Sequence, residues 1–515
     1  MRYSTTKKTI MAIWAVVETL LFGGLIFGWG SVVFVLKDSG VYSHLCDSRR
    51  DIGFSTTAQE IKGCSEQDSR LSLVFAIDSA LYGLGCAVIG HINYTFGTRI
   101  TRIISSIIFM TGTLLMAFES QSLPWLVFPG LACLGIGGIP LFITNAQIGK
   151  LFERGGPTFV ALLSGAVSTS AVVELVAKIA YENGFAMKHF YLLLTGLYSM
   201  TFVSTFFFLP KDFITKPTET LFDKTSNKKE QITGISYIYS PEFEYYQIYN
   251  GNKGQRYTSN NKPLAIEYDV EISKSLPSLK QCLVSQEYIL QVYWFSVLQL
   301  QYFYFLSSMN PWLSELFHGD QKQVSYYTNA LLYLMMGNFI LSPIVGALYD
   351  WFKHYFEGSL SKKRRELMPA VIPLMCGSLA GVTLAILVSI PSTSATLIPT
   401  FSVLVVFRSF VYSSPTSVFS AIFPSQYFGS LFGIMIVSGG ILGLFQFALF
   451  TWSEATSFLR VNHFLLAVIS TTFIHPLLQW RSCRKAEQNV TNNNNKKETT
   501  ANDCQHPPSL SAPST

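Results

Sequence analysis

The sequence predicts an all-α polytopic membrane protein with twelve transmembrane helices in two six-helix halves. Three features support this fold class: a low charge content, a series of long apolar segments, and one long polar segment near the middle. Of the 515 residues, 49% are hydrophobic and 13% are charged, whereas soluble domains carry roughly 25% charged residues. The 41 Phe and 25 Tyr side chains need an apolar environment. This composition excludes a water-soluble enzyme, a disordered scaffold and a nucleic-acid-binding protein.

Twelve segments are apolar and long enough to cross the hydrocarbon core of a bilayer, which takes about 20 residues in a helix. In the first half of the chain they are 10–36, 71–94, 100–118, 124–151, 159–181 and 190–209. In the second half they are 288–316, 326–351, 367–390, 395–423, 428–452 and 463–480. The first segment is too long for the apolar region of a signal peptide, and no cleavage site follows it. We therefore expect it to be a transmembrane helix.

The predicted spans divide the chain into four parts. Residues 1–209 form the N-terminal half, with an external loop at 37–70, and residues 286–482 form the C-terminal half. The polar segment 210–285 could bury little, so we expect a cytoplasmic central loop with one surface helix. Segment 483–515 is of low complexity, which predicts a disordered cytoplasmic tail.

Basic residues flank the spans on one side of the membrane, whereas the short loops on the other side contain few. This asymmetry predicts that both termini are cytoplasmic. We expect a multi-pass protein of the plasma membrane. The flanking basic residues include Arg2, Lys7, Lys8, Arg99, Arg102, Lys150, Arg154, Lys362, Lys363, Arg364, Arg365, Arg481, Arg484 and Lys485.

Cysteine usage is moderate. Eight Cys residues in a chain of this length exclude a disulfide-dense secreted scaffold. Cys46 and Cys64 both lie in the external loop, where we expect them to form a disulfide that closes it. Two free thiols are the alternative.

A short motif recurs at corresponding positions of the two halves. Residues 90–97 follow the second span and residues 346–353 follow the eighth, and both resemble the cytoplasmic motif G-x-x-x-D-R-x-G of the major facilitator superfamily. Two six-span halves around a central loop are typical of these transporters. The resemblance implies that Asp350 is the motif acid, which holds neighbouring helices together in one state of the transport cycle. In the first copy, Tyr94 and Thr95 replace the acid and the arginine.

Further stretches resemble one solute-carrier family within this superfamily. They include 27–31, 71–73, 137–138, 143–149, 298–300, 324–330, 408–410, 423–432, 444–447 and 473–476. Together they are similar to solute carrier family 43, which contains the L-type amino-acid transporters three and four and the equilibrative nucleobase transporter. The similarity is greatest to the nucleobase branch and covers nearly the whole chain except the central loop and the tail. It implies sodium-independent, equilibrative transport.

Polar and aromatic side chains inside the spans are the candidate substrate-binding residues, because polar groups there usually face the interior of the bundle or a water-filled cavity. Asn145 offers one acceptor and two donors to the edge of a flat ring, and Tyr302 shares a helix face with Gln299. Two neighbouring glycines favour a break around Trp29, and broken first spans often contact the substrate. For each residue the alternative is a structural contact between helices. The candidates are Trp29, Thr144, Asn145, Gln299, Tyr302 and Phe447.

Ionisable groups inside the spans are candidates for a gate or an ion pair. Arg408 in the tenth span is always charged and needs partners when buried, and Glu18 and Glu174 are the candidate partners. For Arg408 the alternative is a purely structural role. For Glu174 the alternative is an ion pair with Lys178, four residues later in the same helix. The candidate gating or ion-pair residues are Glu18, Glu174, Asp350 and Arg408, with Tyr327 and Asn329 as an external gate.

Three functional hypotheses follow from the residues and the resemblance. The first is facilitative transport of purine nucleobases such as adenine, guanine and hypoxanthine, because a neutral planar ring needs aromatic faces and amide-type hydrogen bonds. The second is sodium-independent transport of large neutral amino acids, in which Arg408 would anchor the carboxylate. The third is a non-transporting membrane receptor or scaffold.

Sequence motifs for enzyme chemistry are missing. The chain has no G-x-x-x-x-G-K-[ST] phosphate loop, no H-E-x-x-H and no Cys/His spacing of a metal site. We expect no enzymatic activity, no cofactor and no metal. The expected partners are a small-molecule substrate and the lipid bilayer, with no nucleic acid, and the expected oligomeric state is a monomer.

Overall fold

The computed structural model describes residues 4–47, 65–152, 155–214, 235–240, 243–250, 253–257, 263–264, 278–318, 320–390 and 394–503. The chain forms two compact units, one of residues 1–214 with 283–515 and the other of Thr215–Cys282. The first unit contains all twelve predicted transmembrane segments.

The described residues of the N-terminal half fold into α-helices joined by short 3₁₀ or π-helical turns. Its elements are α1 (Thr5–Phe22), η1 (Leu25–Gly28), α2 (Trp29–Asp38), α3 (His44–Asp47), α4 (Ser65–Ala117), η2 (Pro124–Leu126), α5 (Val127–Asn145), η3 (Ala146–Leu151), α6 (Gly156–Thr169), α7 (Ala171–Glu182), α8 (Met187–Tyr198), α9 (Met200–Val203) and η4 (Ser204–Phe208).

Two breaks shape this half. The first span bends by 45° between α1 and the η1–α2 segment. Gly23 caps α1 and Gly24 leaves the helical region, with φ −151° and ψ 35°. The predicted break in the first span is thus confirmed, but it lies one turn before Trp29. The second break is at Gly97, whose φ of 78° favours glycine, and it divides α4 into the second and third predicted spans.

The C-terminal half repeats this helical architecture. Its elements are α11 (Leu279–Leu283), α12 (Gln286–Leu316), α13 (Gln321–Met335), α14 (Asn338–Tyr355), α15 (Lys362–Ser389), α16 (Ser394–Ile422), α17 (Ser425–Gly443), α18 (Phe445–Ala455), α19 (Phe458–Ser470), η5 (Thr471–Phe473) and α20 (Ile474–Asp503). The eighth span is bent by 41° between α13 and α14.

The last helix, α20, continues to Asp503 through a region for which the sequence predicts disorder. Glu487 anchors its extension, because its carboxylate accepts hydrogen bonds from the backbone amides of Leu360 (3.1 Å) and Ser361 (2.8 Å). Arg364 lies 3.6 Å from the same carboxylate. These contacts hold the start of the tail against the loop between α14 and α15.

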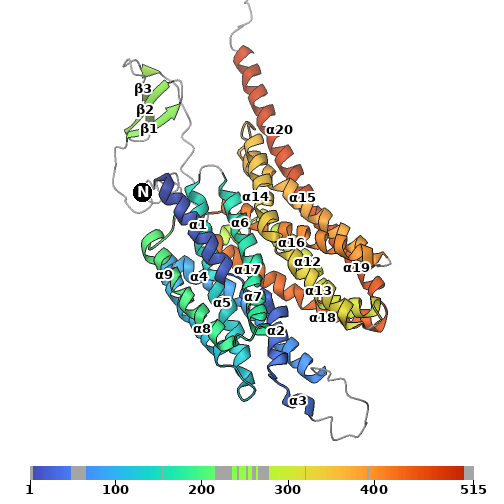
Figure 1. Cartoon of the computed structure of the whole chain (residues 1–515). Helices are drawn as coiled ribbons and strands as arrows, with labels where there is room; N and C mark the ends of the chain where they lie inside the picture. Colours follow the sequence, from blue (N-terminus) through green and yellow to red (C-terminus); the bar gives the residue numbers. More distant parts are fainter. Residues whose placement is uncertain are drawn as a thin grey trace, which may run out of the picture. The chain divides into compact units, whose positions relative to one another are not determined.

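All twelve predicted spans coincide with helices. By length and composition, eight helices of the described residues can cross a membrane, or ten when each bent pair is taken as one span. The helix α4 is one of the eight and contains two predicted spans, and α12 coincides with the seventh. The beginning of α1 and the far end of α20 lie on the same side, here called the terminus side (Figure 1). The opposite side, where α2 ends and α4 begins, is called the loop side.

The second unit contains an antiparallel sheet of four strands in the order β1–β2–β3–β4, where the sequence analysis expects a loop with one helix. The strands are β1 (Ile235–Ser240), β2 (Phe243–Asn250), β3 (Lys253–Tyr257) and β4 (Pro263–Leu264). Tyr and Ile recur in β1 and β2, and such residues favour strands. The strands were not predicted because segment 210–285 as a whole is polar, which hides the local enrichment in Tyr and Ile.

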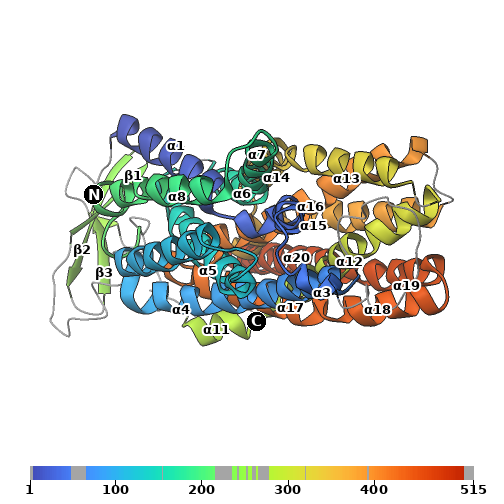
Figure 2. The same cartoon turned by 60° about the horizontal axis from the view of Figure 1, so that its bottom comes forward.

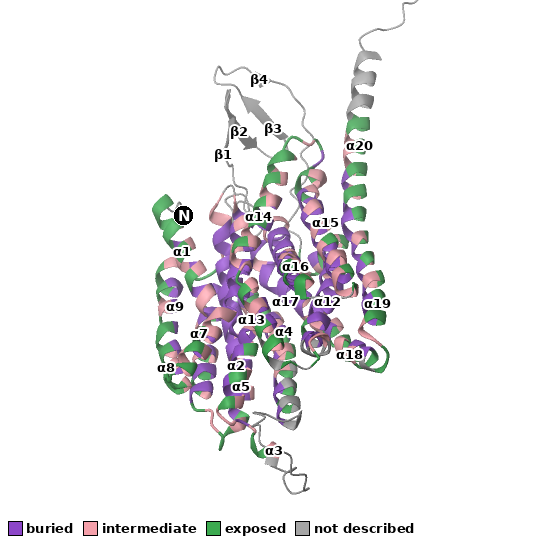
Figure 3. Ribbon diagram, turned by 45° about the vertical axis from the view of Figure 1, so that its right-hand side comes forward, coloured by how far each residue is buried: buried purple, intermediate pink, exposed green. Residues whose placement is uncertain are grey.

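The two helical halves pack along a few central helices. In Figure 2, α1, α4, α5 and α8 of the N-terminal half lie on the left and α12, α13, α18 and α19 of the C-terminal half lie on the right, with α6, α14 and α17 between them. Buried residues concentrate on central helices such as α5, α12, α16 and α17, whereas α8, α19 and α20 carry many exposed residues (Figure 3). Exposed apolar side chains such as Phe207 and Ile107 therefore mark the lipid-facing surface.

Candidate functional site

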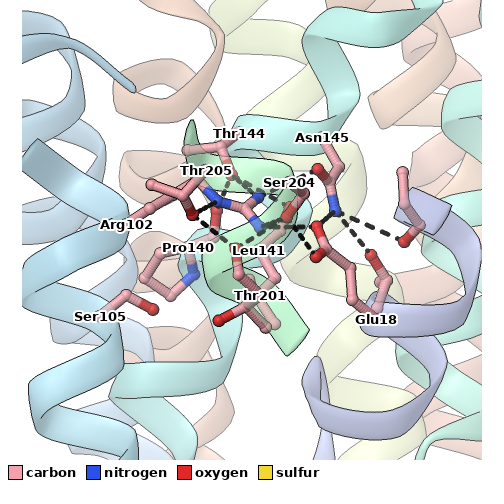
Figure 4. Close-up of polar contacts among 12 residues, drawn as sticks. Glu18, Arg102, Ser105, Pro140, Leu141, Thr144, Asn145, Thr201, Ser204 and Thr205 are labelled. Carbon is pink, nitrogen blue, oxygen red and sulfur yellow. Dashed lines mark hydrogen bonds and ion pairs between the residues drawn. The ribbon is translucent and has the colours of Figure 1, made fainter. Parts of the chain in front are cut away.

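The N-terminal half contains a buried ion pair between Glu18 on α1 and Arg102 on α4. Arg102 Nη2 lies 2.7 Å from Glu18 Oε1, and the two side chains are 1% and 0% exposed. Asn145, the last residue of α5, donates to the same carboxylate oxygen at 2.7 Å, and Ser204 donates to Oε2 at 2.7 Å. Figure 4 shows these groups converging on the carboxylate. The negative charge of Glu18 is therefore well compensated.

Each guanidinium nitrogen of Arg102 has a partner in this cluster. Nε donates to Thr205 at 2.8 Å and Nη2 donates to Ser204 at 2.6 Å. Nη1 donates to Thr144 at 3.0 Å and to the amide oxygen of Asn145 at 3.1 Å. A fully satisfied buried pair of this kind fixes the relative positions of the helices that contribute to it.

This cluster changes the interpretation of three predicted site residues. The predicted pairing of Glu18 with Arg408 is wrong, because Glu18 pairs with Arg102. Thr144 and Asn145 are both 0% exposed and bonded within the cluster. In this state they connect helices, and their contact with substrate stays a prediction.

Glu174 on α7 pairs with neither of its two predicted partners, Arg408 and Lys178. Its Oε2 accepts a hydrogen bond from Tyr191 of α8 at 3.0 Å. Lys178 instead lies 3.8 Å from Glu182, within the same helix. The predicted pairs of Glu174 with Arg408 and with Lys178 are therefore wrong, because Tyr191 is closer to the carboxylate than either cation.

Arg408 on α16 lies where the two halves meet, inside a cage of aromatic rings. Its guanidinium carbon is 5.2 Å from the ring centre of Phe27, 5.1 Å from that of Tyr302 and 5.8 Å from that of Tyr412. Phe27 belongs to η1 of the N-terminal half, whereas Tyr302 and Tyr412 belong to the C-terminal half. Cation–π attraction to three rings stabilises the buried charge, which is 4% exposed.

The hydrogen bonds of Arg408 are incomplete. Nη1 donates to the hydroxyl of Tyr302 and lies 3.7 Å from Met335 Sδ. Nε is buried without a partner, and neither Nε nor Nη2 donates to any described residue. No carboxylate of the described residues lies within ion-pair distance of Arg408. The guanidinium therefore keeps one edge, formed by Nε and Nη2, free to bind an acceptor.

Two predicted substrate residues adjoin this cage. Tyr302 contacts Arg408 directly, and Gln299 lies one turn earlier on α12. Gln299 is 4% exposed, and its Oε1 has no hydrogen-bond partner. A Cβ atom on Gly439 of α17 would lie 2.7 Å from that oxygen, so the glycine provides the space that Gln299 occupies. The unpaired amide oxygen thus lies against α17, and its residue is one helical turn from the cage residue Tyr302 on α12.

Trp29 and Phe447 lie outside the cage. The ring of Trp29 stacks on Phe75 of α4, with ring centres 5.4 Å apart and planes at 10°. Phe447 on α18 is 55% exposed. The structure therefore does not bring the six predicted substrate residues together in one place, and the roles of Trp29 and Phe447 in binding remain predictions.

On the terminus side the two halves are in close contact along α4 and α17. A Cβ atom on Gly90 would lie 2.3 Å from the carbonyl oxygen of Gly429, and Ser430 donates to the carbonyl of Gly90 at 3.2 Å. Tyr94, at the motif position of the missing acid, packs on Tyr427 with ring centres 5.4 Å apart. An aromatic contact thus replaces the acid in the first motif copy.

The second copy keeps its acid and also connects the halves. Asp350 at the end of α14 accepts hydrogen bonds from the backbone amide of Thr158 at 3.0 Å and from its hydroxyl at 2.5 Å. Thr158 lies in the first turn of α6, where the helix dipole stabilises a negative charge. Gly346, one turn before Asp350, lets α14 approach the same turn of α6.

The remaining predicted residues lie near the loop side. Tyr327 on α13 stacks on Phe317, with ring centres 5.1 Å apart and planes at 8°, and Asn329 is partly exposed. Their role in a gate stays a prediction. Cys46 is in α3, whereas Cys64 lies outside the described residues, so the Cys46–Cys64 disulfide also stays a prediction.

Three buried ionisable residues of the described chain were not predicted from the sequence: Arg102, Asp78 and His475, which is 1% exposed in the last predicted span. Arg102 was assigned to the flanking basic residues, but the break at Gly97 starts a new helix before it and places it inside the bundle. Asp78 on α4 is 0% exposed, and neither carboxylate oxygen has a partner in the described part of the chain. The signal for Asp78 was a single acid inside the apolar segment 71–94.

Comparison with known proteins agrees with this architecture. The model of the Major Facilitator Superfamily matches residues 50–447. The chain therefore belongs to the major facilitator superfamily, as predicted, and it has the membrane fold and the non-enzymatic character of these transporters.

Two curated relatives extend over most of the chain. The equilibrative nucleobase transporter 1 of Bos taurus is 29% identical over 487 residues, which cover 91% of this chain and 95% of the relative. The human large neutral amino acids transporter small subunit 3 is 25% identical over 494 residues, which cover 86% of this chain and 87% of the relative. Both relatives are named as transporters of small organic molecules, so the predicted solute-carrier resemblance is confirmed.

Solved structures share the fold at low sequence identity. The proton:xylose symporter XylE, bound to 6-bromo-6-deoxy-D-glucose, is 13% identical, with a TM-score of 0.55 over 93% of this chain and 96% of XylE. The human organic anion transporter MFSD10 is 11% identical, with a TM-score of 0.55 over 90% of this chain and 99% of MFSD10. These structures show the shared fold alone. The superfamily match and the two curated relatives identify the chain as a multi-pass membrane transporter for a small molecule.

Proposed function

We propose that the chain is a facilitative, sodium-independent transporter of purine nucleobases such as adenine, guanine and hypoxanthine, located in the plasma membrane with both termini in the cytoplasm. Transport equilibrates the substrate by alternating access, in which the two halves rock around a central site. The aromatic cage around Arg408 is the observation that carries this proposal.

The cage suits a flat ring that carries hydrogen-bonding edges. The three rings around Arg408 offer apolar faces, and the free edge of its guanidinium offers donors. The unpaired amide oxygen of Gln299 offers an acceptor. Phe27 comes from one half, and Tyr302 and Tyr412 come from the other. A substrate bound here would contact both halves, as alternating access requires.

Close packing on the terminus side supports the rocking mechanism. Gly90 and Gly429 bring α4 and α17 together, and Asp350 connects α14 to α6. A substrate can leave toward the terminus side only after these contacts open. The opposite movement would close the loop side around the same cage.

The competing proposal is a transporter of large neutral amino acids. One relative carries this name, and the free edge of Arg408 suits a carboxylate. An amino acid also carries an ammonium group, which needs acceptors or a negative charge. Among the described residues no carboxylate forms an ion pair with Arg408, and the three neighbouring groups of its cage are aromatic rings. We therefore favour a neutral ring over a zwitterion.

Uptake measurements separate these proposals. Cells that express the chain should take up radiolabelled purines in the absence of sodium and of a proton gradient, and leucine uptake should stay at background. Tyr302→Phe removes the hydroxyl that binds Arg408 and should reduce purine uptake at unchanged surface expression. Leucine uptake without purine uptake would assign the chain to the amino-acid branch. Accessibility of terminal epitope tags in intact cells tests the orientation.

A further inference from the structure

The free edge of Arg408 has a defined shape. The rings of Phe27, Tyr302 and Tyr412 surround the guanidinium, and Nη1 is bonded to Tyr302. The remaining edge consists of Nε–H and one N–H of Nη2. These two N–H groups are parallel and lie in one plane, because the guanidinium is flat. They match a ligand that presents two acceptors side by side.

Leaving this edge unpaired is unfavourable. Arg408 cannot lose its charge, and a buried N–H without an acceptor loses its hydrogen bond to water without compensation. The Nε of Arg408 has no hydrogen-bond partner, and water has little access to it because the side chain is only 4% exposed. Arg102 in the other half is buried to a similar degree but has a partner for each nitrogen. The contrast indicates that the missing partner of Arg408 is the transported molecule.

We propose that Arg408 recognises the adjacent O6 and N7 acceptors of a 6-oxopurine, so that the transporter prefers hypoxanthine and guanine to adenine. This inference rests on the proposed function and specifies its substrate class. In 6-oxopurines, O6 and N7 lie on the same edge as two acceptors, and arginine binds this pair in a bidentate manner. Adenine has an amino donor at the corresponding position, so only one of the two N–H groups finds an acceptor.

Tyr302 positions the arginine for this recognition. Its hydroxyl accepts from Nη1 and fixes the guanidinium against rotation, which leaves the Nε side as the recognition edge. The ring of Phe27, one residue before Gly28 in the broken first span, covers the guanidinium from the other half. When the two halves move, the ring of Phe27 therefore moves relative to Arg408, the residue that binds the edge of the base.

Competition binding tests the proposal on the purified chain in lipid nanodiscs. Radiolabelled hypoxanthine is displaced by unlabelled hypoxanthine, by adenine and by 7-deazahypoxanthine, which keeps O6 but lacks the N7 acceptor. We expect wild type to bind hypoxanthine about tenfold more tightly than either competitor, since one lost hydrogen bond to a charged group corresponds to about this factor.

Variants of Arg408 sharpen the test. Arg408→Gln replaces two donors by one donor and one acceptor, which match N7 and the amino group of adenine. It should remove the preference for hypoxanthine or reverse it toward adenine. Arg408→Lys keeps the charge but loses the planar pair of donors, so the preference should shrink. Arg460→Gln makes the same chemical change on the exposed face of α19 and should leave the preference intact.

The outcomes separate this inference from the proposed function. If wild type binds 7-deazahypoxanthine and adenine as tightly as hypoxanthine, purine transport stands but the assigned role of Arg408 is overturned. A folded Arg408→Gln protein that keeps the wild-type preference would also overturn it. If the chain binds leucine and no purine, both proposals fail. Should Arg408→Gln not fold, the comparison of the three purines on wild type decides the matter alone.

Discussion

At the scale of single residues, two buried arginines have opposite surroundings. Arg102 is bonded at each nitrogen and faces Glu18 across 2.7 Å, whereas Arg408 has aromatic neighbours and a free edge. A paired charge with complete hydrogen bonds stabilises one arrangement of helices. A charge with unmet donors can bind a ligand and release it, because its partner is not part of the chain.

Glu18→Gln tests the structural role of the first arginine. The substitution leaves Arg102 buried without a counter-charge, and breaking a buried pair costs about 3–5 kcal/mol. We expect a strongly reduced yield of monodisperse protein in size-exclusion chromatography and a lower melting temperature. Ser204→Ala keeps the ion pair but removes one donor to the same carboxylate and one acceptor of Arg102, and it should cost less, about 1.5–3 kcal/mol. If Glu18→Gln is as stable as wild type but alters transport, Glu18 acts in the transport cycle instead.

The sequence shows which residues are ionisable within apolar segments, but it does not show their partners. It correctly marks Glu18 and Arg408 as buried charges. It misplaces Arg102 because the residue lies near a predicted span end, where basic residues usually face the cytoplasm. The partner of a buried charge depends on which helices pack against each other. A single sequence contains no direct information on these helix neighbours.

At the scale of elements, the break in the first span depends on glycines that allow close helix contact. A Cβ atom on Gly28 would lie 2.5 Å from Cβ of Glu174, and one on Gly24 would lie 2.3 Å from the carbonyl oxygen of Val167. Neither distance is compatible with a side chain unless η1 moves away from α6 and α7. Gly30, two residues later, has nothing within 4 Å of such an atom.

Gly28→Ala and Gly30→Ala therefore form a matched pair. Gly28→Ala should displace η1 from α7, shift the neighbouring Phe27 relative to Arg408, and reduce both the melting temperature and substrate uptake. The clash with Glu174 involves carbon atoms near the backbone, for which overpacking costs about 1–3 kcal/mol. Gly30→Ala should leave both measurements close to wild type. Equal effects of the two substitutions would contradict this account of the break.

Most elements, but not all, could be predicted. Long apolar segments identify the helices because an unpaired backbone is too costly in lipid. The exact break was predicted around Trp29 and lies at Gly23–Gly24, since any of several neighbouring glycines could interrupt the helix. The sheet in the central loop was not expected, because the polar composition of 210–285 obscured the Tyr- and Ile-rich strands.

At the scale of the whole molecule, two kinds of contact hold the halves together on the terminus side. Along α4 and α17, Gly90 packs on Gly429 and Tyr94 on Tyr427. Between α6 and α14, the contact consists of two charge-assisted hydrogen bonds, from the backbone amide and the hydroxyl of Thr158 to Asp350. The first kind depends on shape and excludes water. The second depends on charge, so a single isosteric substitution can weaken it without changing the packing.

Asp350→Asn should therefore shift the equilibrium between the two access states. Hydrogen bonds to a charged group contribute about 1.5–3 kcal/mol, roughly twice the contribution of neutral ones. Losing about 1.4 kcal/mol from the state closed on the terminus side raises the population of the state open there about tenfold. Spin labels are placed on cysteines at Phe96, beside the Gly97 break in α4, and at Tyr355, the last residue of α14, both of which are exposed. They report this change as longer distances in pulsed electron resonance.

Asp320→Asn provides the control for this measurement. Asp320 also accepts backbone hydrogen bonds at a helix start, but from Lys322 and Gln323 of its own helix α13. Its substitution removes a similar charge without affecting the contact between the halves, so the distance distribution should match that of wild type. An unchanged distribution in Asp350→Asn would show that glycine and aromatic packing alone holds the terminus side closed. In that case Asp350, the acid of the second motif copy, would contribute nothing measurable to closure, whereas Tyr94, which replaces the acid in the first copy, would contribute through its packing on Tyr427.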